Sequence, residues 1–265
     1  MNIGITAYVI FIAYTDNKKY NLFWRQLHYW YLVPLILLYF KELYLMVDPI
    51  RGVIFDDWLI KADRFIFGTD PTHSLMKIAN PYLTELLQIV YGTFYFLPII
   101  LGISLTINGK YEELDYSAFI IVYGFILSYI GYILLPAIGP RFTLHDFSKN
   151  NFEMPGLFLT DFLREIVNSG ESIPKGTLNP AAVVQRDAFP SGHTQMTLLA
   201  MYLSVKFKSR TKYFLIPNGL LLIFSTVYLR YHYVTDLIGG FAFMLLTLWS
   251  GKFIYKFWNN TRNNF

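Results

Sequence analysis

Long apolar runs recur along most of this chain, and they constrain its fold more than any other feature. A membrane-spanning helix needs about 20 predominantly apolar residues. Runs of close to that length occupy residues 28–46, 84–107, 117–137, 192–207, 213–230 and 233–253. Only 15% of the 265 residues are charged, whereas about 25% are charged in a typical soluble domain. We therefore predict an all-α, polytopic membrane protein with a six-helix transmembrane core.

An apolar stretch near the N-terminus adds an extra element to this core. Residues 2–14 are short for a span, and they carry neither a basic leader nor a small-residue cleavage site. They predict a short extra membrane helix rather than a signal peptide, followed by a polar loop over residues 15–27. We expect residues 1–265 to form one membrane-embedded domain, with residues 1–27 as an N-terminal addition and residues 28–257 as the six-span core.

Two segments between the runs are predicted to lie outside the membrane, at residues 52–82 and 138–190. The first places apolar side chains at helical spacing with charges between them, which is typical of an amphipathic helix in the membrane surface. Gly68 suits the end of that helix, and Asp70 followed by Pro71 suits the start of a second short one. Two interpretations of the charges stay open: a solvated face, or a frame around the entrance for a lipid headgroup.

The orientation in the membrane follows from a basic turn at residues 206–212, which carries four Lys or Arg side chains. Such a cluster between two spans favours the cytoplasmic side. The spans then place residues 141, 193, 230 and 232 together on the extracytoplasmic or luminal face. Within the long segment on that face, residues 157–167 predict a surface helix and residues 168–180 a loop rich in Gly, Pro and Ser.

The sequence Phe-Pro-Ser-Gly-His at residues 189–193 stands where this segment meets an apolar run. Ser191 suits the N-cap of the following helix. The first N–H groups of a helix have no acceptor within it, so those at Gly192 and His193 can face an anion. A histidine at that position is placed to donate a proton to the bound group.

A second polar stretch at residues 230–236 contains His232 and Asp236, four residues apart. On a helix this spacing puts both side chains on one face. A carboxylate that binds one imidazole nitrogen fixes the tautomer and leaves the other nitrogen free to attack. Arg230 adds a permanent charge in a form suited to phosphate oxygens.

Together the two stretches resemble the signature of the type 2 phosphatidic acid phosphatase superfamily. Its three motifs are Lys-x6-Arg-Pro, Pro-Ser-Gly-His and Ser-Arg-x5-His-x3-Asp, and the second is intact here. The third keeps Ser225, His232 and Asp236, but Thr226 stands where the family has arginine. Arg230 lies about one helical turn later, so its charge can reach a similar face.

The first family motif is degenerate in this chain. Arg141 supplies the arginine, but Leu134 stands where the family has lysine. Lys149 and Lys175 are candidate replacements that the sequence does not separate. These departures are similar to those of the inositol phosphorylceramide synthase-like branch, and the resemblance covers residues 50–250.

The resemblance implies a metal-independent enzyme without a cofactor that acts on a membrane lipid. In that chemistry His232 is the nucleophile, Asp236 orients it, and His193 is the general acid and base. The groups expected to bind the phosphate are Arg141, Ser191, Gly192 and Arg230, with Arg186 as a further candidate. Arg186 has a second interpretation, a local ion pair with Asp187.

Several functional classes stay open or are excluded. Either water or a lipid hydroxyl can be the acceptor, which makes the chain a lipid phosphatase or a headgroup phosphotransferase. A transporter is the alternative of another class, but it predicts ionisable groups near mid-span, whereas these lie at span ends. The net charge of +4 comes from scattered basic residues and does not favour nucleic-acid binding. The absence of cysteine excludes disulfides and thiolate catalysis.

Overall fold

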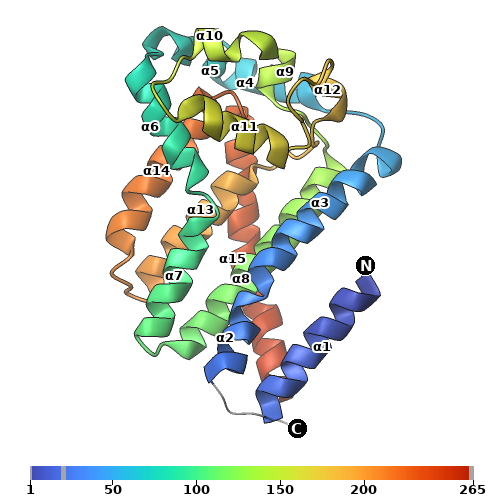
Figure 1. Cartoon of the computed structure of the whole chain (residues 1–265), viewed down its shortest axis with the longest axis vertical. Coiled ribbons are helices and arrows are strands. Elements are labelled where there is room, and N and C mark those ends of the chain that lie inside the picture. The colour runs from blue at the N-terminus through green and yellow to red at the C-terminus, as the bar shows by residue number, and fades with distance from the viewer. Residues whose placement is uncertain (1, 19–21, 263–265) are drawn as a thin grey trace. The chain divides into compact units, whose positions relative to one another are not determined.

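The structure is a computed structural model that describes residues 2–18 and 22–262, and within them every regular element is helical (Figure 1). Part of the predicted polar loop, residues 19–21, lies outside the described residues. Internal contacts divide the chain into two compact units, Met1–Leu43 and Tyr44–Phe265. The grouping of residues 1–265 into one membrane-embedded domain stays a prediction.

The first unit contains α1 (Asn2–Lys18), α2 (Leu22–Trp30) and the first part of α3 (Leu32–Ile50), and α1 packs against α2. The extra helix predicted at residues 2–14 is therefore present as α1. Its apolar part is shorter than a full span, so its passage through the membrane stays a prediction.

The second unit holds the remaining helices. The first group is α4 (Asp56–Phe67), α5 (Pro71–Leu75), η1 (Met76–Ile78), α6 (Pro81–Gly92), α7 (Phe96–Ile107) and α8 (Tyr111–Leu134). Short elements follow: α9 (Pro140–Thr143), η2 (Phe147–Lys149), α10 (Asn150–Glu153), α11 (Thr160–Gly170) and α12 (Pro180–Val183). The last three helices are α13 (Gly192–Lys206), α14 (Lys212–Tyr228) and α15 (Val234–Arg262).

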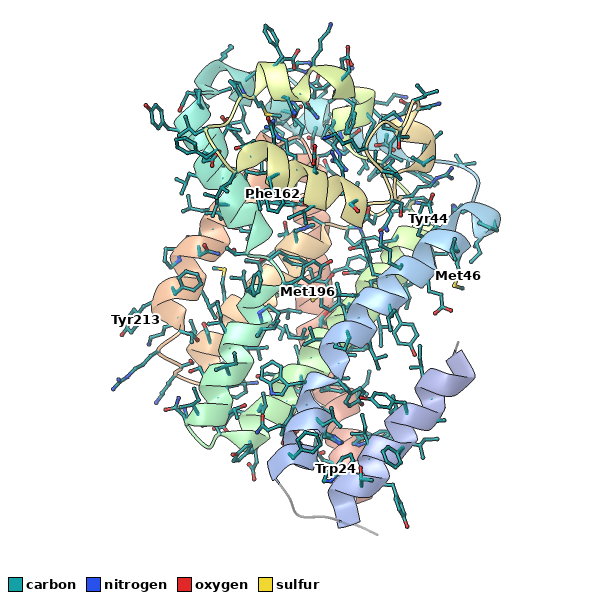
Figure 2. All side chains as sticks on the ribbon, in the orientation of Figure 1. Trp24, Tyr44, Met46, Phe162, Met196 and Tyr213 are labelled. Atoms are coloured by element: carbon teal, nitrogen blue, oxygen red, sulfur yellow. The ribbon has the colours of Figure 1, made fainter. Side chains whose placement is uncertain are left out.

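Helix α13 is the centre of this unit, because it packs against α7, α8, α14 and α15. Its side chains are buried on several faces, and Figure 2 shows Met196 inside the bundle while Tyr213 and Phe162 point outward. A buried amide ties the helices together. Gln195 accepts a hydrogen bond from Ser128 of α8 and donates to Thr247 of α15. The side-chain groups of Ser128, Gln195 and Thr247 are therefore all paired, as an apolar interior requires.

Several helices have the length and composition of membrane spans. Three such stretches occur in the described residues, at Gln26–Val47, Tyr111–Leu134 and Val234–Asn260, and the bent pair of α6 and α7 makes a fourth. The all-α, multi-span fold is therefore confirmed. All six predicted spans coincide with helices. However, α13 and α14 are shorter than the roughly 20 residues of a typical span, so the count of six spans stays a prediction.

The span predicted at residues 84–107 is a bent pair of helices, α6 and α7, and not one straight helix. The two have the length and composition of one span when taken together, and they are bent by 53° at the break between them. Two local features explain the break. Pro98 has no N–H and its ring crowds the carbonyl four residues earlier, and the Thr93 hydroxyl donates to the Val90 carbonyl at 2.6 Å.

The amphipathic helix predicted within residues 52–82 is α4, and Gly68 ends it in the left-handed conformation, as predicted. Its outer face exposes Trp58 and Phe65. The interpretation of all its charges as a solvated face is wrong, because Asp56 and Asp63 are each only 2% exposed. They lie on the inward face of the helix, a position that the apolar spacing alone did not reveal.

The elements α4, α5 and α9–α12, which come from the two segments predicted to lie outside the membrane, gather at one end of this unit, and the basic turn between α13 and α14 lies at the other end (Figure 1). Helix α11 begins at Thr160, three residues after the predicted start. The Glu85 side chain of α6 sets this start, because it accepts hydrogen bonds from the N–H groups of residues 157–160. A carboxylate at a helix N-terminus stabilises it.

Candidate active site

Ser191 forms the N-cap of α13, as predicted: its hydroxyl oxygen accepts from the Thr194 N–H at 3.2 Å. Its backbone N–H donates to the Asp236 carbonyl at 3.0 Å, which joins the starts of α13 and α15. The next position requires glycine, because a Cβ at residue 192 would lie 2.3 Å from the Tyr132 hydroxyl. The Pro-Ser-Gly-His motif is therefore closely packed by its own surroundings.

His232 lies in the connection between α14 and α15, so the expected helical placement of His232 and Asp236 on one face is wrong. Helix α15 begins only at Val234. The two side chains still meet, with His232 Nδ1 3.3 Å from Asp236 Oδ2. A shorter contact of 2.9 Å joins the same nitrogen to the carbonyl oxygen of Ala188. The partner is a backbone oxygen, which every residue has, so nothing in the sequence indicated this contact.

Asp236 stands in the first turn of α15 and is fully buried. Its Oδ2 also accepts from the Tyr233 N–H at 2.8 Å. A carboxylate in the first turn of a helix here accepts from the N–H of the residue just before the helix, and this contact fixes the direction in which the chain enters the helix. Asp236 therefore orients both the imidazole and the backbone that carries it.

The two predicted catalytic histidines face each other. His232 Nε2 lies 3.3 Å from His193 Nδ1. Burial lowers the pKa of His232 to about 4, although the charge of nearby Asp187 and the Ala188 carbonyl act in the opposite direction. His232 is therefore neutral at physiological pH, which keeps a lone pair on one nitrogen.

His193 is held between two aromatic rings, one from the end of α6 and one from the break between α6 and α7. The Tyr91 ring stacks on the imidazole with centroids 4.6 Å apart, and the Phe94 centroid is 4.3 Å away on a tilted ring. Tyr91 also stacks on Tyr231 at 4.4 Å. The guanidinium of Arg141 lies 4.8 Å from the Tyr231 centroid. A column of rings thus links His193 to Arg141.

Arg141 is 3% exposed and lines a cavity. Its guanidinium donates to Asn168 Oδ1 at 2.9 Å and is ion-paired with Glu171. Its backbone N–H donates to the Arg230 carbonyl at 3.1 Å, so the segment after α8 and the His232 loop are joined. The sequence did not reveal the acidic partner of Arg141, and the phosphate-binding role of Arg141 stays a prediction.

Arg230 has a different environment from the one expected. Its side chain is fully buried, paired with Glu153 at 2.6 Å, and it donates to Asn150 and Met76. No contact found in the described residues joins its guanidinium to either histidine. A phosphate-binding role for Arg230 stays a prediction, and these contacts favour an anchor for the loop. Arg186 is half-buried in the segment before Ser191.

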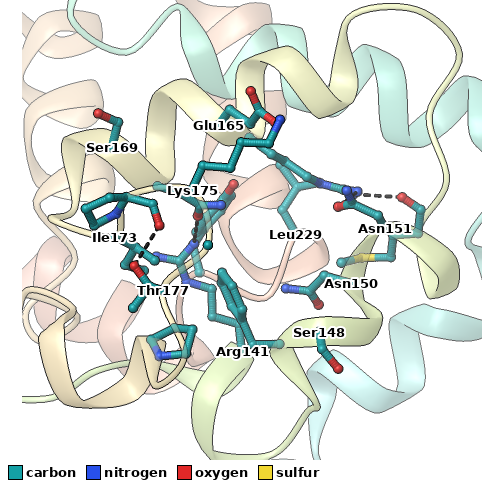
Figure 3. A pocket seen from close by; sticks show the side chains of 18 residues that line it. Arg141, Ser148, Asn150, Asn151, Glu165, Ser169, Ile173, Lys175, Thr177 and Leu229 are labelled. Atoms are coloured by element: carbon teal, nitrogen blue, oxygen red, sulfur yellow. Dashed lines mark hydrogen bonds and ion pairs between the residues drawn. The ribbon is translucent and has the colours of Figure 1, made fainter.

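A cavity of about 530 Å³ opens beside Arg141 and Tyr231 (Figure 3). Amides and cations on its wall are Arg141, Asn150, Asn151, Arg164, Asn168 and Lys175. Of the two candidates for the missing lysine, Lys175 lines this cavity and binds Glu165, while Lys149 pairs with Asp146. In residues 2–18 and 22–262, no group of three His, Asp or Glu side chains is arranged to hold a metal ion.

The site thus combines an intact Pro-Ser-Gly-His motif with a second histidine and a carboxylate behind it. The sequence matches the PAP2 superfamily over residues 57–250. This chain belongs to the PAP2 superfamily. The match includes the segments that carry His193, His232 and Asp236, so the family to which the motifs pointed is confirmed.

One curated relative of this PAP2 protein is the inositol phosphorylceramide synthase of Candida albicans. The two are 26% identical over 192 residues, which covers 70% of this chain and 39% of the relative. The chain therefore spans well under half the length of that relative. The similarity supports the branch that the degenerate outer motifs suggested. No solved structure gives a significant match.

Proposed function

We propose that this PAP2 protein is a membrane lipid phosphatase or phosphotransferase that works through a phosphohistidine on His232, at the extracytoplasmic face. The observation that carries the proposal is the placement of the two imidazoles. His232 Nδ1 is 2.9 Å from the Ala188 carbonyl, so the single proton of the neutral ring belongs there. The lone pair is then on Nε2, which lies 3.3 Å from His193 Nδ1.

In the first half-reaction, His232 Nε2 attacks the phosphorus of a lipid phosphate or phosphodiester. An N–P bond forms, the P–O bond to the leaving group breaks, and His193 gives that oxygen a proton. Asp236, 3.3 Å from His232 Nδ1, stabilises the positive charge that develops on the ring. The leaving oxygen departs as a neutral hydroxyl.

The phosphoryl oxygens need donors and positive charge in place before the reaction. We assign this role to Arg141, to the N–H groups of Gly192 and His193 in the first turn of α13, and to Ser191. Arg230 and Arg186 stay as further candidates. In this scheme these groups supply the charge that metal ions supply in many other phosphoryl-transfer enzymes.

In the second half-reaction an acceptor hydroxyl attacks phosphorus, the N–P bond breaks, and His193 takes the acceptor's proton. Water as acceptor gives a phosphatase, and a lipid hydroxyl gives a headgroup phosphotransferase. The cavity beside Arg141 favours the second, because amide side chains such as Asn151 and Asn168 suit a bulky hydroxyl-bearing headgroup. The name of the Candida relative describes a synthase of that kind.

The experiment that tests the function compares lipids by mass spectrometry in cells that make wild-type or His232→Ala protein. We expect one phosphorylated lipid class to change only with the wild type. A new phosphodiester lipid indicates a phosphotransferase, and loss of a phosphate without such a product indicates a phosphatase. Identical lipid profiles would contradict the proposal.

A second experiment separates the roles of the two histidines. With a radiolabelled phosphate ester that has an activated leaving group, His193→Ala should still form an acid-labile, base-stable phosphohistidine and release it slowly. His232→Ala should form none. Label retained in His232→Ala and absent from His193→Ala would reverse the assignment.

A further inference from the structure

Two carboxylates on the inward face of α4 have no part in the chemistry described so far. Asp56 and Asp63 stand seven residues apart, which is about two helical turns and therefore one face. Both are 2% exposed. Buried carboxylates are retained only where they are bonded well, so the groups that they bind indicate their role.

Asp56 binds two segments that are distant in the sequence. Its Oδ1 accepts from the Gly139 N–H at 2.8 Å and from the Tyr233 hydroxyl at 2.9 Å. Its Oδ2 accepts from the Ile138 N–H at 3.0 Å. Tyr233 is the residue directly after His232, so Asp56 holds one side of the loop that carries the nucleophile.

Asp63 binds the other side of the same loop. Its Oδ2 accepts from the Val234 N–H at 3.0 Å, and its Oδ1 accepts from the Thr235 N–H at 2.8 Å and from the Thr235 hydroxyl at 2.6 Å. These are the first N–H groups of α15, which have no acceptor inside the helix. Asp63 therefore caps α15 from another helix.

The contacts of Asp56 close a ring around His232. The segment bound by Asp56 includes Ile138, and the neighbouring Ala137 carbonyl accepts from the Ala188 N–H at 3.0 Å. The Ala188 carbonyl in turn lies 2.9 Å from His232 Nδ1. The next residue, Tyr233, returns to Asp56. Buried Leu59, Ile60 and Tyr233 pack against Ala137 and Ala188 in one cluster.

We propose that Asp56 and Asp63 are positioning residues that set the attack geometry of His232. They touch neither the imidazole nor the expected phosphate. They fix the backbone on both sides of His232 and, through residues 137–138, the carbonyl that holds its tautomer. This inference rests on the proposed function, because its readout is phosphohistidine formation.

The test measures single-turnover labelling of the full-length protein in detergent micelles, with radiolabelled phosphatidic acid and phosphatidylinositol as probes. The variants are Asp63→Asn, which leaves one acceptor oxygen, and Tyr233→Phe, which removes only the hydroxyl that donates to Asp56 and also contacts the Thr143 hydroxyl. Asp63→Asn should slow labelling about 10²-fold, the cost of a displacement near 1 Å. Tyr233→Phe should slow it about tenfold, the rate equivalent of the hydrogen bond to Asp56. The half-saturating lipid concentration should not change.

Glu85→Gln is the matched control. Glu85 is also a buried carboxylate that holds a helix N-terminus from another helix, but it binds residues 157–160 and not the His232 loop. It should lower thermal stability and leave the labelling rate as in the wild type.

The decision rests on Tyr233→Phe, which keeps its packed ring and therefore its fold. Slowed labelling in this variant, with a normal rate in Glu85→Gln, supports the proposal. A wild-type rate in Tyr233→Phe, or an equal loss in Glu85→Gln, overturns it while the proposed function stands. Absence of label from wild-type protein with both probes overturns the proposed function, and the positioning role falls with it.

Discussion

The substitution Gly240→Ala, which adds a single methyl group, should slow the reaction by displacing the two helices that carry the site, without changing any catalytic side chain. Gly240 lies one helical turn after Asp236 on α15 and against the start of α13. A Cβ at this position would lie 2.6 Å from the Ser191 carbonyl oxygen and 3.0 Å from the Thr194 Cβ. The nearest obstacle is backbone, which a rotamer change cannot relieve, so Gly240→Ala must move one helix away from the other.

The size of the effect follows from that distance. Ordinary contact begins at 3.4 Å, so the shortfall is about 0.8 Å, close to the ~1 Å displacement that costs ~10²-fold in rate. The displacement acts on the 3.0 Å bond from the Ser191 N–H to the Asp236 carbonyl, and so on the spacing of His193 and His232. Overpacking should also cost about 1–3 kcal/mol of stability.

Gly251→Ala is the matched control, because it lies on the same helix about 16 Å farther along. Its Cβ would lie 2.7 Å from the end of the Ile120 side chain, which can move. The assay is the single-turnover formation of phosphohistidine, together with the midpoint of thermal unfolding. We expect Gly240→Ala to lose ~10²-fold in rate and Gly251→Ala to stay near the wild type. A folded Gly240→Ala protein that labels at the wild-type rate would refute the reasoning.

Three further predictions use other parts of the molecule. Because the chain has no cysteine, single cysteines at Arg210 and Lys149 should react with an impermeant reagent from opposite sides of the membrane; reaction from one side contradicts the topology. Since Arg230 pairs with Glu153 at 2.6 Å, Glu153→Gln should lower turnover about as much as Arg230→Ala, by roughly tenfold. A fully active Glu153→Gln protein together with an inactive Arg230→Ala protein would indicate that Arg230 binds the phosphate instead. The lowered pKa of His232, about 4, keeps the nucleophile neutral above that pH, so on the acid side the labelling rate should fall as the pH drops through about 4. A fall on the acid side near the ordinary histidine pKa of ~6.5 would contradict this.

Local features of the fold could be predicted because their causes are local in the sequence. The apolar runs coincide with helices, Gly68 ends α4, and Ser191 caps α13, since each depends on a few neighbouring residues. The break between α6 and α7 was missed although Thr93 and Pro98 were visible, because a window of average apolarity hides a local loss of hydrogen bonds.

The candidate site could be predicted in part. The motifs gave His193, His232 and Asp236, and the fold brings them into contact. The partners of Arg141 and Arg230 could not be predicted, because Glu171 follows α11 and Glu153 lies in α10, in a segment that carries no motif. The Ala188 carbonyl could not be predicted either, since every residue has the same backbone group.

The sequence by itself determined a bundle of membrane helices with two histidines near one end, because apolar period and helix caps act over a few residues. Only the tertiary structure decided what surrounds those histidines. Asp56 and Tyr233 are 177 residues apart, and their bond exists because a buried carboxylate must find donors wherever the folded chain supplies them. Asp56 and Asp63 are seven residues apart and so share a face of α4, but only the folded chain decided that this face is buried.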